Sequence, residues 1–358
     1  MQQVVCAERS HQVLKIGEIA GFAVRSHACA NRNALSSIHA TAHARPNIVI
    51  AVMELPPAGH EPVLLREVIE ALAPAPGKVI VDCTIGRAGH AVEIARRLGP
   101  DGLLVGLDAD PRNLEFARSR LAEAPCRVRL FHANFAELPD VLEQVGTKAV
   151  DGILADLGIS TNQLFDPQYG LSFTTGGALD MRLDPRLTQS AADLINEMRE
   201  TDLADVLYNL AQERWSRRIA RKIVDARRVS PIRSTERLAE LVRWAVPSPR
   251  GGASRARARE KIDPATRTFL ALRMKVNREM ENLAALLEQA PRYLSRGGRL
   301  AVISFQSMED RMVKQTFRSA EQAGLVRIVT KKPLTPSDEE LAANPRSRSA
   351  KLRVAERK

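Results

Sequence analysis

Apolar residues recur along the chain at two spacings, which alternate from Pro62 onwards. Apolar, β-branched runs typical of strands are separated by stretches in which apolar residues recur every three or four positions, as in helices. The expected helices are 63–72, 91–98 and 111–123, and the expected strands are 79–83, 103–108, 127–134 and 149–158. This alternation predicts a doubly wound, mostly parallel α/β sheet, whose ligands bind at the carboxyl ends of the strands.

The alternation stops after Asp156 and gives way to helical periodicity alone. Helices are expected at 190–198, 201–228 and 234–246, with Trp215, Ile219 and Ile223 on one stripe. The alternating pattern then resumes with a long helix at 264–290, a strand at 299–305, a helix at 307–320 and short strands at 325–332 and 350–357. We therefore predict a sheet domain formed by 53–165 and 264–358, interrupted by an inserted all-α domain at 166–263.

Residues 1–52 differ from the rest, with four of the seven histidines, two of the four cysteines and no clear periodicity. A metal site at Cys6, His11, His27, Cys29, His39 and His43 is disfavoured, because these spacings match no regular ligand pattern. A transit peptide is a second interpretation, since five Arg or Lys stand against two Glu. The simplest interpretation is an extension upstream of a natural start at Met53. No metal site is expected in the rest of the chain.

Charge is distributed unevenly. The chain has a net charge of +11, while residues 213–278 hold 19 Lys or Arg against 6 Asp or Glu, a local net charge of +13. Six acids cannot pair with all these cations, so the segment favours a nucleic-acid surface over a solvated helical face. The candidate nucleic-acid-binding residues are Arg217, Arg218, Arg221 and Arg267. Scattered cysteines without a C-x-x-C pair favour a reducing compartment, and no apolar stretch approaches the roughly 20 residues that a membrane span needs.

The first predicted strand ends in DCTIGRAGH at 82–90. Gly86 and Gly89 allow backbone amides to approach a ligand, but the dinucleotide fingerprint G-x-G-x-x-G is absent, and two glycines alone fit an empty turn equally well. Asp108 ends the second strand, where an acid accepts hydrogen bonds from ribose hydroxyls. With Asp156 at a later strand end and Phe135 as an apolar face for adenine, the set favours S-adenosylmethionine. Singly, these residues also fit a helix cap, a turn and the core.

The chain also resembles a known family. GHEPVLLREV, DCTIGRAGH, DGILADLGIS, GALDMRLDP, ERWSRRIARKIV, DPATRTFLALRMKVN, SFQSMEDR and NPRSRSAKLRVAER occur in the same order in the bacterial 16S ribosomal RNA cytosine-N4 methyltransferases. The resemblance runs from about residue 59 to the C-terminus. It implies a class I, Rossmann-like methyltransferase domain, S-adenosylmethionine as methyl donor, and the exocyclic amine of a cytidine in the decoding region of small-subunit rRNA as acceptor.

By position, the resemblance places the cofactor contacts at Ala88, Gly89, His90, Asp108, Phe135, Asp156 and Gln163. The sequence departs from the family pattern at Ile85, Ala88, Asp263 and Gln306, where Phe, Gly, His and His are usual. We expect Ala88 to be tolerated if its φ is negative. Gln306 puts an imidazole base at that position in doubt.

The amine of cytosine is a poor nucleophile, so the enzyme must aim it at the methyl group. Asp156 or a backbone carbonyl of LGIS is the candidate acceptor for its hydrogens, and the cytidine is expected to leave the base stack. The rivals are a DNA or other RNA amino-methyltransferase, a non-catalytic RNA-binding protein on the same scaffold and a small-molecule methyltransferase. The absence of a proline–aromatic motif disfavours the first of these rivals. The filled cofactor positions disfavour the second, and the basic insert disfavours the third. The resemblance implies a cytoplasmic enzyme whose partner is the small ribosomal subunit; a homodimer stays open.

Overall fold

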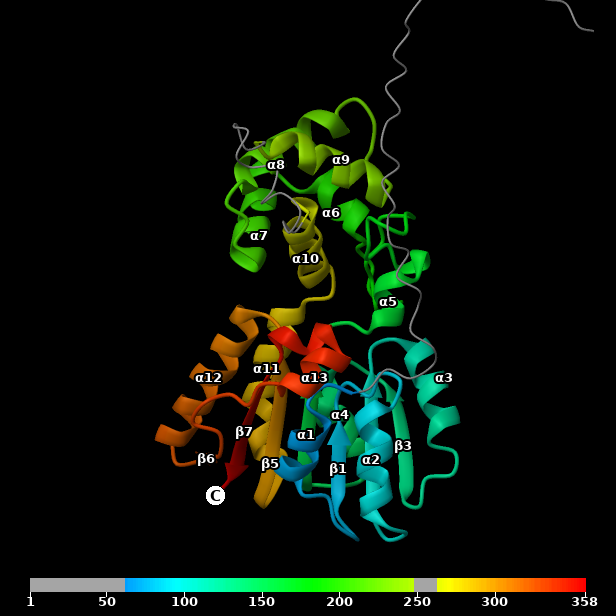
Figure 1. The fold of residues 1–358 in the computed structure, drawn as a ribbon, viewed down its shortest axis with the longest axis vertical. Helices are drawn as coiled ribbons and strands as arrows, with labels where there is room; N and C mark the ends of the chain where they lie inside the picture. Colours follow the sequence, from blue (N-terminus) through cyan, green and yellow to red (C-terminus); the bar gives the residue numbers. More distant parts are fainter. Residues whose placement is uncertain (1–61, 248–262) are drawn as a thin grey trace, which may run out of the picture. The chain divides into compact units, whose positions relative to one another are not determined.

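The computed structural model describes residues 62–247 and 263–358, so the hypotheses placed on residues 1–52 lie outside the described part. A seven-stranded sheet has the order β3-β2-β1-β4-β5-β7-β6 (Figure 1). All neighbouring strands are parallel except β7, which is antiparallel to β5 and to β6. The strands are β1 (Val79–Asp82), β2 (Leu103–Asp108), β3 (Arg127–His132), β4 (Val150–Asp156), β5 (Leu294–Ser304), β6 (Val326–Ile328) and β7 (Lys351–Arg357). The doubly wound, mostly parallel α/β fold predicted from the sequence is confirmed.

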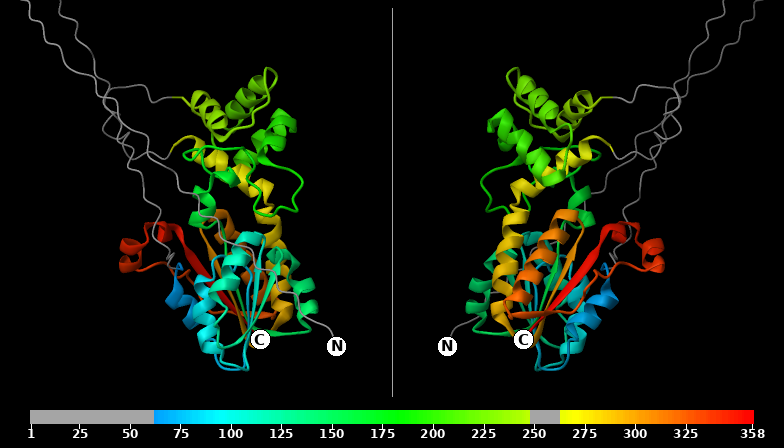
Figure 2. Two further views of the ribbon diagram at one scale, coloured as in Figure 1. Left: turned by 90° about the vertical axis from the view of Figure 1, so that its right-hand side faces the viewer. Right: turned by 90° about the vertical axis from the view of Figure 1, so that its left-hand side faces the viewer.

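Helices cover both faces of the sheet (Figure 2). On one face lie α1 (Leu65–Leu72), α2 (Gly89–Leu98) and α3 (Pro111–Arg120), and on the other α4 (Leu138–Val145), α11 (Glu279–Tyr293) and α12 (Ser307–Gln322). Successive residues of a strand point to opposite faces, so Ile80 packs with the first layer and Val81 with the second. Burial on both faces explains why the strands read as continuous apolar runs.

The inserted segment forms a helical core of its own. It contains α6 (Ala191–Glu197), α7 (Glu200–Ala211), α8 (Ser216–Arg227), α9 (Thr235–Ala245) and α10 (Ala265–Val276). The expected stripe is confirmed, because Ile219 and Ile223 are fully buried and Trp215 packs against them. The single helix expected at 201–228 is wrong: α7 ends at Gln212, whose φ of +52° lies in the left-handed region.

The long helix expected at 264–290 is also two helices. Arg278 separates α10 from α11 with a φ of +51°, and the preceding Asn277 is buried. The side chains of α10 belong to the helical core, whereas those of α11 pack against the sheet. By packing, the chain therefore returns to the sheet between Val276 and Glu279. The domain bounds at 166–263 and 264–358 stay a prediction.

Several short elements had no clear signal in the sequence. They are α4, α5 (Thr161–Phe165), α13 (Asp338–Ala343) and the 3₁₀ turns η1 (Phe135–Glu137), η2 (Pro167–Tyr169) and η5 (Pro345–Ser349). No helix among the described residues is long and apolar enough to cross a membrane. Nor do three or more His, Cys, Asp or Glu side chains gather in a metal-binding arrangement within this part of the chain.

Candidate active site

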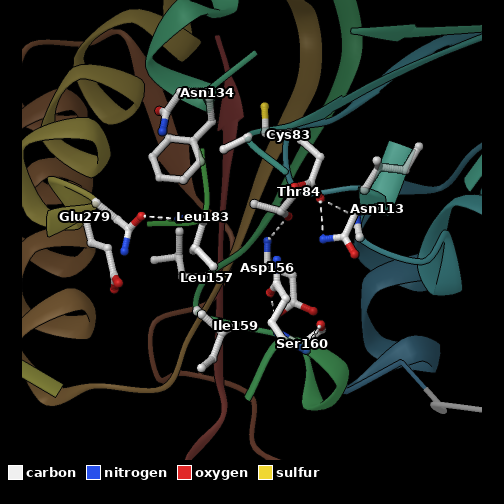
Figure 3. A pocket seen from close by; sticks show the side chains of 18 of the residues that line it. Cys83, Thr84, Asn113, Asn134, Asp156, Leu157, Ile159, Ser160, Leu183 and Glu279 are labelled. Carbon is white, nitrogen blue, oxygen red and sulfur yellow. Dashed lines mark hydrogen bonds between the residues drawn. The ribbon is translucent and has the colours of Figure 1, made fainter. Parts of the chain in front are cut away.

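A cavity of about 830 Å³ opens at the carboxyl ends of β1, β2 and β4. Gly86, Gly89, His90, Asp108, Phe135, Asp156 and Gln163 all line it, whereas Ala88 is fully buried behind the loop and does not. Figure 3 shows Thr84, Asp156 and Asn113 close together, with Leu183 and Glu279 across the cavity from Asn113. The sheet and the helical insert therefore both contribute walls to one space.

The loop after β1 is held against the end of β2. The Gly86 amide, at a φ of +49°, donates to Asp108 Oδ2 over 2.8 Å. The side chain of Ile85 packs over Gly106, where a Cβ would overlap with Ile85 Cδ1 and would displace it. Ala88 is the N-cap residue of α2 and has a φ of +61°, so the negative φ on which we made its tolerance conditional is not found. This position has the backbone conformation that glycine adopts most readily.

The carboxylate of Asp108 accepts hydrogen bonds from three neighbouring donors. Oδ1 accepts from the amide of Asp110 over 2.8 Å, and Oδ2 accepts from Gly86 and from Asn113 Nδ2. Burial raises the pKa of Asp108 to about 6, against the lowering effect of these hydrogen bonds. A carboxylate has about four acceptor positions, so three donors leave room for a hydroxyl from the cavity.

A second group of carboxyls surrounds Asp156. Burial, together with the charges of Asp82 and Glu309, raises the pKa of Asp156 to about 8, and burial raises that of Asp82 to about 7. Asp156 Oδ1 is buried without a hydrogen-bond partner. Its other oxygen lies 3.8 Å from His90 Nδ1, and His90 Nε2 lies 2.9 Å from the Val63 carbonyl. A carbonyl only accepts, so Nε2 carries the proton of this contact.

The side chain of Gln163 is engaged at both ends. Its Nε2 donates to Asp110 Oδ2 over 2.8 Å, and its Oε1 accepts from the Ser160 amide over 3.0 Å. The Tyr169 hydroxyl donates to the same oxygen of Asp110. Gln163 thus lines the cavity mainly as part of a network that fixes the loop after β4.

The wall of the cavity opposite Asn113 is joined to the insert by polar contacts at the α10–α11 junction. Asn277 Oδ1 accepts from the Leu183 amide over 2.9 Å, and its Nδ2 donates to the Met181 carbonyl over 2.8 Å. Arg273 makes a bidentate pair with Glu279 at 2.7 and 2.9 Å. The contacts of Asn277 join the α10–α11 junction to the segment before α6, and the sequence contains no signal for them beyond single polar residues.

The structure shows the contacts of two residues that depart from the family pattern, Asp263 and Gln306. Asp263 Oδ1 accepts from the amide of Ala265 at the start of α10, and its other oxygen pairs with Arg243 over 2.9 Å. Gln306 lines the cavity, and its backbone amide donates to the buried Glu309. An amide side chain cannot act as an imidazole base, so Gln306 supplies no such base here.

The family model of the MraW methylase family matches residues 57–358. The chain belongs to this family. A relative of the methylase in Syntrophobacter fumaroxidans, named "Ribosomal RNA small subunit methyltransferase H", is 45% identical over 317 residues, which cover 84% of this chain and 97% of the relative. A relative of the same name in Solibacter usitatus is 48% identical over 297 residues, covering 83% and 99%.

The candidate RNA-binding residues of the methylase lie outside the cavity. Arg217, Arg218 and Arg221 are exposed on α8, and Arg267 is exposed on α10. Arg221 lies 3.4 Å from Glu200, and Arg218 lies over the ring of Trp215 at 5.5 Å. The structure thus presents these four arginines on the insert and the candidate cofactor residues at the sheet.

Proposed function

We propose that this methylase transfers the methyl group of S-adenosylmethionine to the exocyclic N4 amine of a cytidine in the decoding region of 16S rRNA. The observation that carries the proposal is a cavity, in a member of a methylase family, that is lined both by the strand-end carboxyls Asp108 and Asp156 and by residues of the helical insert. The names of the relatives support the small-subunit rRNA as substrate.

The residues of the cavity fit the cofactor. Asp108 has acceptor capacity left for a ribose hydroxyl, Phe135 offers an apolar face, and Gly89 keeps the start of α2 free of a side chain. His90 and the loop residues Gly86, Arg87 and Gly89 line the same space, as does Gln163. When bound, S-adenosylmethionine supplies an electrophilic methyl group on a sulfonium.

Asp156 is the residue that we propose to orient the amine. Its unpartnered Oδ1 is an acceptor for an N–H of the amine, which localises the nitrogen lone pair. With a pKa of about 8, Asp156 is largely protonated at neutral pH. A positive charge in the cavity lowers the pKa of a nearby carboxyl, so the acceptor form is favoured when the site is loaded.

RNA is held by the insert. Arg217, Arg218, Arg221 and Arg267 are exposed cations suited to phosphates, and the cytidine is turned out of its stack to reach the cavity. The partner is the small ribosomal subunit, which places the enzyme in the cytoplasm. Sedimentation of the purified enzyme decides between the monomer and the homodimer.

The test is incubation with labelled S-adenosylmethionine and small subunits that lack the modification, followed by nucleoside mass spectrometry. We expect labelled N4-methylcytidine at one rRNA position, none with Asp156→Asn, and none on DNA. Label in DNA, or in another RNA only, would favour the DNA or other RNA amino-methyltransferase. RNA binding without any label would favour a non-catalytic RNA-binding protein.

A further inference from the structure

One tryptophan of the insert lies open to solvent among cations. Trp244, near the end of α9, has 61% of its surface exposed. Lys222 Nζ on α8 lies 5.6 Å from the centre of its ring, and the guanidinium of Arg237 lies 5.4 Å from it. The sequence drew attention to Trp215, which the structure places against the helical core instead. Trp244 has no role in that core.

The surroundings of Trp244 favour a polyanion. The exposed charged residues of α8 and α9 are six Lys or Arg against three Asp or Glu. Arg237 is paired with Glu240 at 3.2 Å, while Lys222 has no ion pair with a described residue. A protein partner with an apolar surface would remove water from these cations and offer them no hydrogen bonds in exchange, which costs free energy. A nucleotide offers the ring a base and the cations a phosphate.

We propose that Trp244 is a stacking platform for an unpaired base of the RNA substrate, with Lys222 and Arg237 holding the phosphates beside that base. The proposal rests on the proposed function, since it assumes an RNA substrate. Aromatic side chains stack on any base, and RNA segments with unstacked bases are the ones that proteins read in this way. A nucleotide that enters the cavity must itself leave a stack, so bases near it in sequence are available.

The experiment measures binding of the full chain to a fluorescent single-stranded oligouridine and to an RNA duplex of the same length. We expect Trp244→Ala to weaken binding of the single strand about five- to 150-fold, the factor that corresponds to loss of one stacked base. Trp244→Phe should keep most of the affinity. Stacking releases no counterions, so the salt dependence should not change in Trp244→Ala, whereas Lys222→Gln with Arg237→Gln should flatten it.

Tyr208→Ala is the matched control, because Tyr208 is an aromatic residue of α7 with 52% of its surface exposed. The platform is overturned if Trp244→Ala binds the single strand as the unchanged protein does, if it loses the duplex equally, or if Tyr208→Ala has the same effect. A change of sedimentation in Trp244→Ala would overturn it in favour of self-association. If the unchanged protein bound both RNAs but methylated none, the proposed function would fail and the platform would stand.

Discussion

Ala88 shows how one residue balances two opposed effects. In the left-handed conformation an L-residue other than glycine loses about 1–2 kcal/mol. The methyl group of Ala88 is fully buried in the core between the sheet and α1, α2 and α3, which stabilises the fold by about 0.8 kcal/mol. Glycine would also be more flexible in the unfolded chain, by about 0.4–1 kcal/mol. The sum is close to zero, so alanine is acceptable where the family pattern has glycine.

We therefore expect Ala88→Gly to change the free energy of unfolding by less than about 1 kcal/mol. Ala88→Val should cost about 2 kcal/mol or more, because a β-branched residue neither adopts this φ nor fits a fully packed site. Urea denaturation of the ligand-free enzyme measures both. A clear stabilisation by glycine would show that backbone strain outweighs the buried methyl group.

Asp108 gives a second prediction at the scale of one residue. Asp108→Ala removes the ribose acceptor and should weaken binding of S-adenosylmethionine by about 1.5–3 kcal/mol. It also leaves the amides of Gly86 and Asp110 without their acceptor, so Asp108→Asn, which keeps an oxygen, is the matched variant. Calorimetric titration with the cofactor checks the effect, and unchanged affinity in Asp108→Ala would remove this residue from the cofactor site.

At the scale of elements, the sequence predicted the strands and the site at their ends better than it predicted the helices. The strands are recognisable as apolar runs because they are buried on both faces. Several of these runs end in an acidic residue, which therefore lies at the carboxyl edge of the sheet. Helical periodicity continues through Gln212 and through Arg278, although both adopt a left-handed φ that breaks the helix. Only tertiary contacts, such as those of Asn277 with Met181 and Leu183, select these breaks. Gln163 was found by resemblance, but its network with Asp110 was not.

Helix α8 carries a prediction of its own. Replacing Arg217, Arg218 and Arg221 by Gln should weaken RNA binding and reduce the salt slope by about 0.7–0.9 for each arginine that contacts a phosphate. Arg66, Arg118 and Arg292 are exposed on sheet-domain helices, so their replacement by Gln makes the same charge change elsewhere. Filter binding at several salt concentrations compares the two variants. An equal effect of both would mean that only net charge matters.

Asp156→Asn should behave in the opposite way, with RNA still bound and methyl transfer lost. A neutral amide is a weaker acceptor for the amine and gives a weaker field at the developing charge. Single-turnover methylation together with RNA binding tests this. Full transfer by the Asn variant would point to a backbone carbonyl of the segment 157–160 as the acceptor.

For the whole molecule, three carboxyls at strand ends determine how stability depends on pH. Asp82, Asp108 and Asp156 have pKa values raised to about 7, 6 and 8, against 3.8 as the ordinary value. The folded state therefore binds protons that the unfolded state has released, which stabilises it at low pH. This stabilisation is lost as the pH rises through the folded pKa values.

We expect the free energy of unfolding of the ligand-free enzyme to fall between about pH 5 and pH 8. Asp156→Asn should flatten this dependence, while Asp205→Asn, at an exposed position of α7, should not. Urea denaturation at three pH values measures the slope. Stability that rose with pH over this range would show that these carboxyls are ionised in the folded enzyme.

The position of β7 has a consequence for biosynthesis. This strand is made after every other strand of the sheet, yet it lies between β5 and β6 and pairs with both. Its Arg353 also holds Asp310 on α12, next to the cavity residue Glu309. A chain whose translation stops before residue 351 leaves two strand edges open, and such edges attract other chains. We expect truncated products to aggregate or to be degraded, so that cells contain either the finished enzyme or none of its activity.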